Sequence, residues 1–432
     1  MIGLQELEKT TNATVISKGA SNRFENIFID SRKVTPGSIF FAIKGNRFDG
    51  HDFIDEAVKN GAVAVVCQKD IKPIEGVSLL KVDDSIKALG MLARFNRLKY
   101  SIPVIAVTGS VGKTTTKELI AKNLIRYGDT VYTEDNQNNH IGVPLTLLKI
   151  NRFTKYAVIE IGSNHPGEIS YLASLVKPTH SLITSVGASH LEAFETIENV
   201  IAEKLSVMDE TDSKGYLIID ASDDLLVSNA MEKAREIDFD KKRIIRFYAD
   251  SSDKAKGDIV MSNSAAAKAV FSLIEPGKTF KPVSIELNLR MERRFLNGAS
   301  IVLDCYNANP ISFRYAIEQL NLEDAKRRFV VIGDMAELGK NSIKYHIQIV
   351  NMLRQSGFRM VSYGKMSKAA LDRCGIPAPC FDNPKDAANY LFGELKTGDQ
   401  LLIKGSRAMQ MENIWYELLR LASGRQLELP VS

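Results

Sequence analysis

The stretch VIAVTGSVGKTTTKE, residues 104–118, decides the fold of the middle of the chain. It opens on a continuous apolar run, which is typical of a strand buried on both faces of a sheet. A turn with two glycines and then an amphipathic, helix-like segment follow at once. Strand, glycine turn and helix in this order predict a loop that binds phosphate through backbone N–H groups and a helix N-terminus.

The side chains of this turn suit a nucleotide. The ammonium group of Lys113 can reach β- and γ-phosphate oxygens, and the hydroxyl of Thr114 can bind Mg²⁺. The common pattern has a glycine four positions before Gly112, where this chain has Thr108, so the loop is a shortened form. A glycine turn without nucleotide is the alternative, which the strand–loop–helix context disfavours. The predicted nucleotide-binding residues here are Thr108, Gly109, Ser110, Val111, Gly112, Lys113, Thr114 and Thr115.

Strand-like and helix-like segments alternate on both sides of this loop, which predicts an α/β protein with a parallel, doubly wound central sheet and a Rossmann-like C-terminal domain. The expected strands are 38–43, 62–66, 102–107, 156–161, 181–186, 328–333, 359–364 and 400–405. At about 150 residues per domain, 432 residues predict about three domains. We place them at 1–98, 99–305 and 306–432, with the central domain shortened before Arg290.

The composition narrows the class of protein. A net charge of +4, from 56 basic and 52 acidic residues, is too small to indicate nucleic-acid binding. The four cysteines form no CxxC pair, which predicts free thiols in a reducing compartment. The N-terminus lacks the features of a signal peptide, and no apolar run approaches the ~20 residues of a membrane span. We therefore expect a cytoplasmic protein that does not insert into membranes.

Segments between residues 30 and 412 resemble those of the Mur ligase family, in the same order. They include the phosphate loop, DSRKVTPGSIFFAIKGNRFDGHDFI (30–54), DNQNNHIGVPLTLL (135–148), VIEIGSNHPGEI (158–169) and YNANPI (306–311). The resemblance implies a three-domain, ATP-dependent amide ligase that works through an acyl-phosphate. It is greatest to the type that adds D-alanyl-D-alanine to UDP-N-acetylmuramoyl-tripeptide in peptidoglycan synthesis. It implies small-molecule substrates, and we expect a monomer.

Two segments would bind the acid substrate by this resemblance. Ser31 and Arg32 would contact the UDP portion, because a hydroxyl and a guanidinium together suit a pyrophosphate. A surface turn held by an Asp–Arg pair is the alternative. Asn138, Asn139 and His140 would lie near the substrate carboxylate, and an Asn-rich turn before a helix is the alternative there.

A metal site is expected beside the phosphate loop. Glu160 ends an apolar strand, where ligands of open α/β sheets bind, and its carboxylate suits Mg²⁺. The resemblance adds His190 and, fourteen residues later, Lys204 as a lysine carbamylated by CO₂, with two Mg²⁺ ions in all. Lys113, Glu160, His190 and Lys204 form the predicted catalytic set. A structural histidine and a surface lysine are the alternatives, and Leu205 stands where the family has glycine.

The last predicted residues surround the junction with the third domain. By resemblance, Arg290 would meet phosphate and Asp304 the nucleotide ribose, and Asn307 would lie in the hinge at the substrate. Lys404 and Arg407 could bind a carboxylate of the incoming amine, and a basic surface turn after a strand is the alternative. The phrase DNPK at 382–385 is interpreted as a helix N-cap.

One departure from the family concerns adenine. The family carries a His-Asn-x-x-Asn helix segment before the arginine, yet no histidine lies between His190 and His346. The alanine-rich stretch 264–270 is judged a poor substitute. This leaves open a diverged ligase that acts on another carboxylate and a non-catalytic nucleotide-binding scaffold. Retention of Lys113 and Glu160 argues against simple loss of activity.

Overall fold

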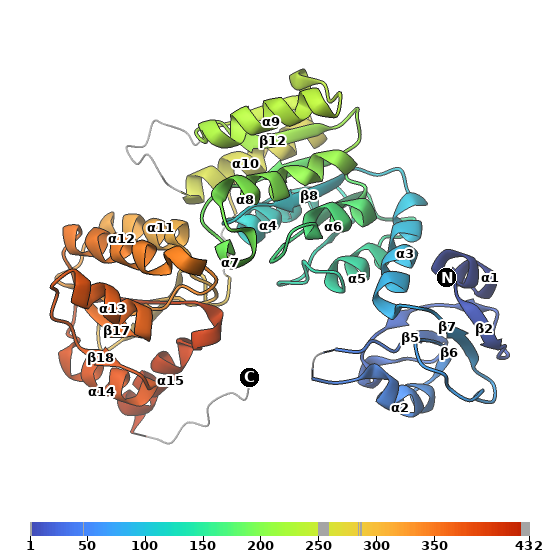
Figure 1. Cartoon of the computed structure of the whole chain (residues 1–432), viewed down its shortest axis with the longest axis horizontal. Helices are drawn as coiled ribbons and strands as arrows, with labels where there is room; N and C mark the ends of the chain where they lie inside the picture. Colours follow the sequence, from blue (N-terminus) through green and yellow to red (C-terminus); the bar gives the residue numbers. More distant parts are fainter. Residues whose placement is uncertain (1, 46, 249–258, 284, 286, 425–432) are drawn as a thin grey trace.

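The computed structural model describes residues 2–45, 47–248, 259–283, 285 and 287–424. Three α/β units follow one another along the chain, and the central unit lies between the other two (Figure 1). This arrangement confirms the predicted fold class. None of the described helices is both long enough and apolar enough to cross a membrane.

The N-terminal unit is built on a five-stranded sheet in the order β2-β7-β6-β5-β4, in which only β2 runs antiparallel to its neighbour. The strands are β2 (Thr14–Ser17), β4 (Ile27–Phe28), β5 (Ser38–Phe41), β6 (Ala62–Cys67) and β7 (Ser78–Lys81). A two-stranded ribbon of β1 (Ile2–Gly3) and β3 (Arg23–Phe24) lies beside it, with helices α1 (Leu4–Thr11) and α2 (Ile54–Lys59). All four residues of β5 are buried, as its apolar sequence predicts.

Helix α3 (Ser85–Leu98) connects the first unit to the central one. It begins where the Asp84 carboxylate accepts hydrogen bonds from the N–H groups of Ile86 and Lys87, at 2.8 and 3.0 Å. Near its C-terminal end, the buried Arg97 donates to the carbonyl oxygens of Val176 and Lys177, each at 3.1 Å. These bonds fix the connecting helix to the central unit.

The central sheet is parallel throughout, in the order β13-β12-β11-β8-β10-β9. Its strands are β8 (Val104–Thr108), β9 (Thr130–Tyr132), β10 (Tyr156–Glu160), β11 (His180–Ile183), β12 (Tyr216–Asp220) and β13 (Ile244–Phe247). Its helices are α4 (Lys113–Leu124), α5 (Gly142–Leu148), α6 (Glu168–Val176), α7 (Leu191–Phe194), α8 (Ile197–Leu205), α9 (Asp224–Glu236) and α10 (Ile259–Ile274). Alternate residues of β8 enter the cores on opposite faces, so the sheet is covered on both sides.

The C-terminal unit has a six-stranded sheet in the order β14-β15-β19-β16-β17-β18, parallel except for the edge strand β14. The strands are β14 (Glu292–Leu296), β15 (Ala299–Asp304), β16 (Arg328–Gly333), β17 (Phe358–Tyr363), β18 (Cys380–Phe381) and β19 (Gln400–Lys404). The helices are α11 (Pro310–Asn321), α12 (Ser342–Gln355), α13 (Lys365–Arg373), α14 (Pro384–Glu394) and α15 (Glu412–Ser423). Asn383 caps α14 by accepting from the N–H of Asp386 at 2.9 Å, as interpreted from the sequence.

The boundary expected after residue 305 falls too late. Strand β14 pairs with β15, and β15 pairs with β19, so the third sheet already begins at Glu292. The side chains of Ile301 and Leu303 are buried in the core of the C-terminal unit. The sequence phrase YNANPI marks the loop into α11, and strand pairing, which that phrase cannot reveal, decides where the unit begins.

We predict that Arg97→Met lowers the free energy of unfolding by about 2–4 kcal/mol, because three carbonyl groups lose charge-assisted bonds from one buried guanidinium. The midpoint of urea unfolding measures the change. Arg94→Met is the matched control, since Arg94 is exposed and makes one such bond, to Ser174. Equal shifts for the two variants would contradict the prediction.

Candidate active site

The phosphate loop has the backbone that the sequence predicts. Gly109 and Gly112 both have positive φ angles, 141° and 87°, and Gly112 is the N-cap of α4. A Cβ atom at Gly109 would collide with Thr184, and one at Gly112 would collide with Asn263. Both positions therefore require glycine, for conformation and for space.

The loop that follows β11 braces the phosphate loop from one side. The N–H of Ser110 donates to the Ser185 carbonyl oxygen at 2.7 Å, and the Thr184 hydroxyl donates to the Val111 carbonyl oxygen at 2.7 Å. The hydroxyls of Ser110 and Ser189 are hydrogen-bonded at 2.9 Å. Sequence reasoning missed Thr184, Ser185 and Ser189, although they follow a strand that ends at the same sheet edge.

Two cationic side chains meet at this loop. Lys113 donates from Nζ to the Gly109 carbonyl oxygen at 2.8 Å. Arg290 donates from Nη2 to the Thr114 hydroxyl at 3.2 Å, and its guanidinium lies 4.0 Å from the centre of the Tyr306 ring. Burial lowers the pKa of Lys113, and the charge of Arg290 lowers it further, while Glu160 opposes both. The loop is therefore positively charged where phosphate oxygens are expected.

Glu160 offers a carboxylate oxygen without a partner. It ends β10, next to β8, and its side chain is 1% exposed. Asn138 donates to Oε1 at 2.8 Å, whereas buried Oε2 has no hydrogen-bond partner among the described residues. A buried, unpartnered carboxylate oxygen beside a hydroxyl-bearing phosphate loop suits a divalent cation. In the described part of the chain, no three His, Cys, Asp or Glu side chains gather at one point.

Lys204 is buried in α8 and is not a surface lysine, so that alternative is wrong. Its Nζ donates to the Ser163 hydroxyl at 2.7 Å and lies 6.0 Å from the centre of the Phe194 ring. Burial, with a smaller effect of the charge on Lys113, lowers the pKa of Lys204 to about 7. The lowered pKa favours the uncharged, nucleophilic form of this amine.

The neighbouring Glu203 has a role that the sequence did not suggest. Its two carboxylate oxygens accept from the N–H groups of Gly167 and Ile169, each at 2.8 Å. It thereby caps α6 from the side, and it fixes the loop from which Ser163 reaches Lys204.

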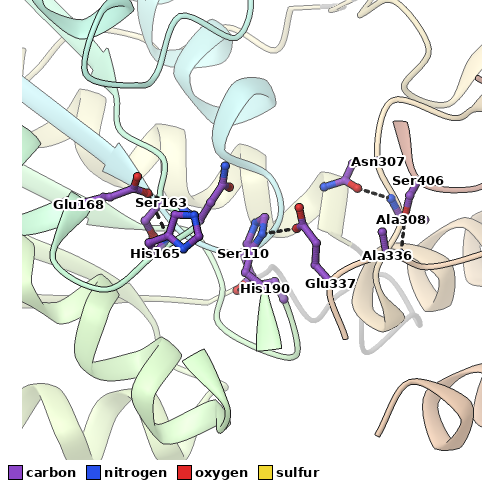
Figure 2. Close-up of polar contacts among 12 residues, drawn as sticks. Ser110, Ser163, His165, Glu168, His190, Asn307, Ala308, Ala336, Glu337 and Ser406 are labelled. Carbon is purple, nitrogen blue, oxygen red and sulfur yellow. Dashed lines mark hydrogen bonds and ion pairs between the residues drawn. The ribbon is translucent and has the colours of Figure 1, made fainter. Parts of the chain in front are cut away.

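His190 touches the C-terminal unit. It has a left-handed backbone, with φ 52°, and its Nδ1 pairs with Oε2 of Glu337 (Figure 2). Hydrogen bonding to His190 lowers the pKa of Glu337. The N–H of Glu192 donates to the Glu337 carbonyl oxygen at 3.0 Å. His190 therefore joins two units as well as lining the cavity.

Most of the predicted residues line one cavity of about 610 Å³ between the central and C-terminal units. They are Ser110, Val111, Gly112, Lys113, Thr114, Thr115, Asn138, Asn139, His140, Glu160, His190, Arg290, Asp304, Asn307 and Lys404. An adjoining cavity of about 270 Å³ is lined by His190, Asn307 and Arg407, among others.

Ser31 and Arg32 line neither cavity. The Ser31 hydroxyl donates to Glu56, and exposed Arg32 pairs with Asp30, which is the alternative that the sequence allowed. Their role with UDP stays a prediction.

Four of the predicted residues already have partners within the protein. Lys404 is buried, and its Nζ pairs with Asp304 at 2.5 Å, so its charge is already offset within the protein. Asp304 also accepts from the N–H of Met291 at 3.2 Å. Asn139 accepts from the N–H groups of Ile141 and Gly142, which is the turn that the sequence left as an alternative. Arg407 pairs with Glu412 and remains half exposed at the smaller cavity.

The alanine-rich stretch, predicted to be a poor substitute for the adenine segment, lies close to the phosphate loop, and its relation to adenine stays a prediction. It forms α10, which packs against α4, and Ala266, Ala267 and Phe271 enter the core on that face of the sheet. Asn263 lines the larger cavity and accepts from the Thr116 hydroxyl at 3.1 Å. The segment lies well before Arg290 in sequence, and only folding brings it over the phosphate loop.

The fold and this site define a nucleotide-dependent enzyme whose active site lies between a phosphate-loop domain and a Rossmann-like domain. Three family models match the chain in order: "Mur ligase family, catalytic domain" at residues 23–97, "Mur ligase middle domain" at 107–290, and "Mur ligase, glutamate ligase domain" at 289–407. The relatives below extend the match over nearly the whole chain. The chain belongs to the Mur ligase family.

Curated relatives and solved structures agree on the type within the family. The UDP-N-acetylmuramoyl-tripeptide–D-alanyl-D-alanine ligase of Buchnera aphidicola is 33% identical over 97% of this chain and 98% of that protein. The Escherichia coli protein of the same name is 32% identical over 92% of this chain and 94% of that protein. The MurF structure from Acinetobacter baumannii matches with a TM-score of 0.86, 27% identity, and coverage of 97% and 99%. The structure of MurF from Thermotoga maritima, in complex with ADP, matches with a TM-score of 0.80 and 26% identity, and the match covers 93% of this chain and 99% of that one.

We predict that Glu160→Gln weakens binding of Mn²⁺, used as a probe for Mg²⁺, at least about 10-fold in the presence of ADP. An amide loses the charge and one oxygen that a hard cation prefers, and even outer ligands are worth about 10- to 100-fold. Electron paramagnetic resonance of free Mn²⁺ measures the affinity. Glu134→Gln, at an exposed ion pair with Lys149, is the control, and an unchanged affinity for Glu160→Gln would refute the assignment.

Proposed function

We propose that this protein is an ATP-dependent ligase that joins D-alanyl-D-alanine to UDP-N-acetylmuramoyl-tripeptide through an acyl-phosphate, in peptidoglycan synthesis. Relatives named for this activity match nearly the full chain. The observation that carries the proposal is the shared cleft. The phosphate loop and Glu160 lie on its central side, and Arg407 and Glu337 lie on its C-terminal side.

Activation of the acid needs compensation for negative charge. In phosphoryl transfer, catalysis is mostly positioning and electrostatic stabilisation of the transferring group. Lys113, Arg290 and the backbone of the phosphate loop supply positive charge there. Mg²⁺, held by Thr114, Glu160 and His190, would add to it when bound. Asn138 orients the Glu160 carboxylate through the bond to Oε1.

Lys204 is the proposed site of a carbamate. Its uncharged amine would attack CO₂, form an N–C bond and release one proton, which turns a cation into an anionic oxygen ligand. The lowered pKa and the burial of Lys204 support this reaction, since both favour the neutral amine. The Ser163 hydroxyl, now 2.7 Å from Nζ, would orient the product.

Ligation then takes place across the cleft. The amine of the dipeptide attacks the acyl carbon, a tetrahedral intermediate forms, and the C–O bond to phosphate breaks, leaving an amide and phosphate. The guanidinium of Arg407 would bind the carboxylate of the dipeptide, because it pairs with Glu412 through one nitrogen only and stays half exposed at the smaller cavity. Closure of the C-terminal unit over the central one would exclude water from the acyl-phosphate.

Location and assembly are extensions of the same proposal. We expect a cytoplasmic monomer that acts on small molecules. All four cysteines are free thiols, which agrees with a reducing compartment. The match to relatives that are all named for one activity argues against a diverged ligase for another carboxylate.

We predict that phosphate release requires ATP, Mg²⁺, UDP-N-acetylmuramoyl-tripeptide and D-alanyl-D-alanine together. Lys113→Ala should lower its rate at least about 100-fold, the cost of losing one group that stabilises the transition state. Lys122→Ala, on the same helix but outside both cavities, is the control. Turnover without the dipeptide, or a Lys113→Ala enzyme near the wild-type rate, would rule out this function.

We predict a carbamate signal from the protein in ¹³C NMR with ¹³C-bicarbonate, and its absence in Lys204→Met. The signal should grow as the pH rises from 6 to 8, because the neutral amine reacts and the pKa of Lys204 is about 7. Lys117→Met is the control, since Lys117 is also buried but pairs with Glu118. A signal that persists in Lys204→Met would disprove the assignment.

A further inference from the structure

One wall of the smaller cavity carries both an acidic and a basic side chain. Glu337 and Arg407 come from the C-terminal unit, and His190 and Asn164 come from the central unit. The cavity adjoins the larger one, with which it shares His190 and Asn307. It therefore lies next to the place where the phosphate loop and Glu160 would activate a carboxylate.

The backbone around Glu337 is held firmly from several sides. The N–H of Met335 donates to Nε2 of His346 at 2.9 Å. The N–H of Ala336 donates to the Ser406 hydroxyl at 2.7 Å, a bond that Figure 2 shows. Glu337 itself has φ 62°, a left-handed conformation that costs a residue with a side chain about 1 kcal/mol or more. Such a conformation, kept by surrounding bonds, points to a function for the side chain it presents.

One oxygen of the Glu337 carboxylate is available to bind a ligand. Oε2 pairs with His190, whereas Oε1 has no hydrogen-bond partner among the described residues. The side chain is half exposed, so a ligand in the cleft can reach it. In Figure 2 it projects from the C-terminal unit toward His190 on the central one.

A cation stands close to this carboxylate on the same wall. Arg407 directly follows Ser406, just as Glu337 follows Ala336, and Ser406 and Ala336 are hydrogen-bonded to each other. A dipeptide carries an ammonium and a carboxylate at most about 7 Å apart, as its bond lengths dictate. A wall with an acid and a base at neighbouring positions matches such a zwitterion in charge.

We propose that Glu337 binds the ammonium group of the incoming dipeptide and holds its nitrogen beside the activated carboxylate, while Arg407 binds the other end. This inference rests on the proposed function and names the residue that selects the amine. Glu337 forms no covalent bond. Its contribution is a charge-assisted hydrogen bond that orients the nitrogen, and the ammonium releases one proton to water before the neutral amine attacks the acyl carbon.

Kinetics of Glu337→Gln test this site. The KM for D-alanyl-D-alanine should rise about 10- to 100-fold, the range for a hydrogen bond to a charged group, while the KM for ATP and for the acid changes little. The first half-reaction is measured separately, with hydroxylamine trapping the acyl-phosphate as a hydroxamate, and its rate should stay near wild type. Glu192→Gln is the matched control, because Glu192 is an exposed acid at the same junction that lines neither cavity.

A substrate analogue gives a second measurement that a merely structural role would not move. D-Lactyl-D-alanine, with a hydroxyl in place of the ammonium, should compete at least about 10-fold more weakly than the dipeptide in the wild type. That preference should vanish in Glu337→Gln and persist in Glu192→Gln.

Each remaining outcome is decisive. An unchanged KM for the dipeptide in Glu337→Gln overturns the ammonium site. Equal loss of hydroxamate and product in this variant also overturns it, because Glu337 would then act through His190 on the acid. If the wild type forms hydroxamate but no product with the dipeptide, the proposed amine substrate is wrong, and this site for it falls as well. If the wild type forms no hydroxamate from UDP-N-acetylmuramoyl-tripeptide, the proposed acid fails, and the inference fails with it.

Discussion

The parallel pairing of β8 with β10 and β11 brings three strand ends to one edge of the central sheet. Val107 pairs with Glu160, and Thr108 pairs with Ile183, so the three segments that follow these strands leave the sheet at the same level. The phosphate loop, the unpartnered oxygen of Glu160 and the bracing hydroxyls after β11 all follow from this register. Because hydrogen-bonded parallel strands cannot slip by one residue without exposing a buried face, the site is as rigid as the core beneath it.

Charge is arranged differently on the two sides of the cleft. On the central side, burial and the nearby charge of Arg290 lower the pKa of Lys113, and Glu160 only partly offsets them. On the C-terminal side, Lys404 is neutralised by Asp304, which leaves Arg407 and Glu337 as the charges that face the smaller cavity. An anionic group is thus drawn to one wall, and a zwitterion fits the other.

Contacts between units are concentrated at few points. The buried Arg97 and the capped helix α3 attach the N-terminal unit to the central one. The contacts between the central and C-terminal units include the pair of His190 with Glu337, the bond from the N–H of Glu192 to the Glu337 carbonyl oxygen, and Gly187, where a Cβ would collide with Ile311. His190 and Glu337 both belong to the proposed chemistry, so binding of substrates and the relative position of the units are coupled through these side chains.

The sequence by itself determined the α/β class, the phosphate loop and the family. These are properties of local pattern: an apolar strand, glycines where φ must be positive, and a helix that begins at once. It also predicted the position of Glu160 correctly, because the last residue of a buried strand lies at the edge of the sheet.

Tertiary structure alone decided the other features of the site. Burial between α8 and the Ser163 loop lowers the pKa of Lys204, and pairing with Asp304 removes Lys404 from the set of free cations. Packing of α10 on α4 brings Asn263 over the phosphate loop, and strand pairing starts the third unit at Glu292. Each of these depends on contacts between residues far apart in the chain, which no local pattern records.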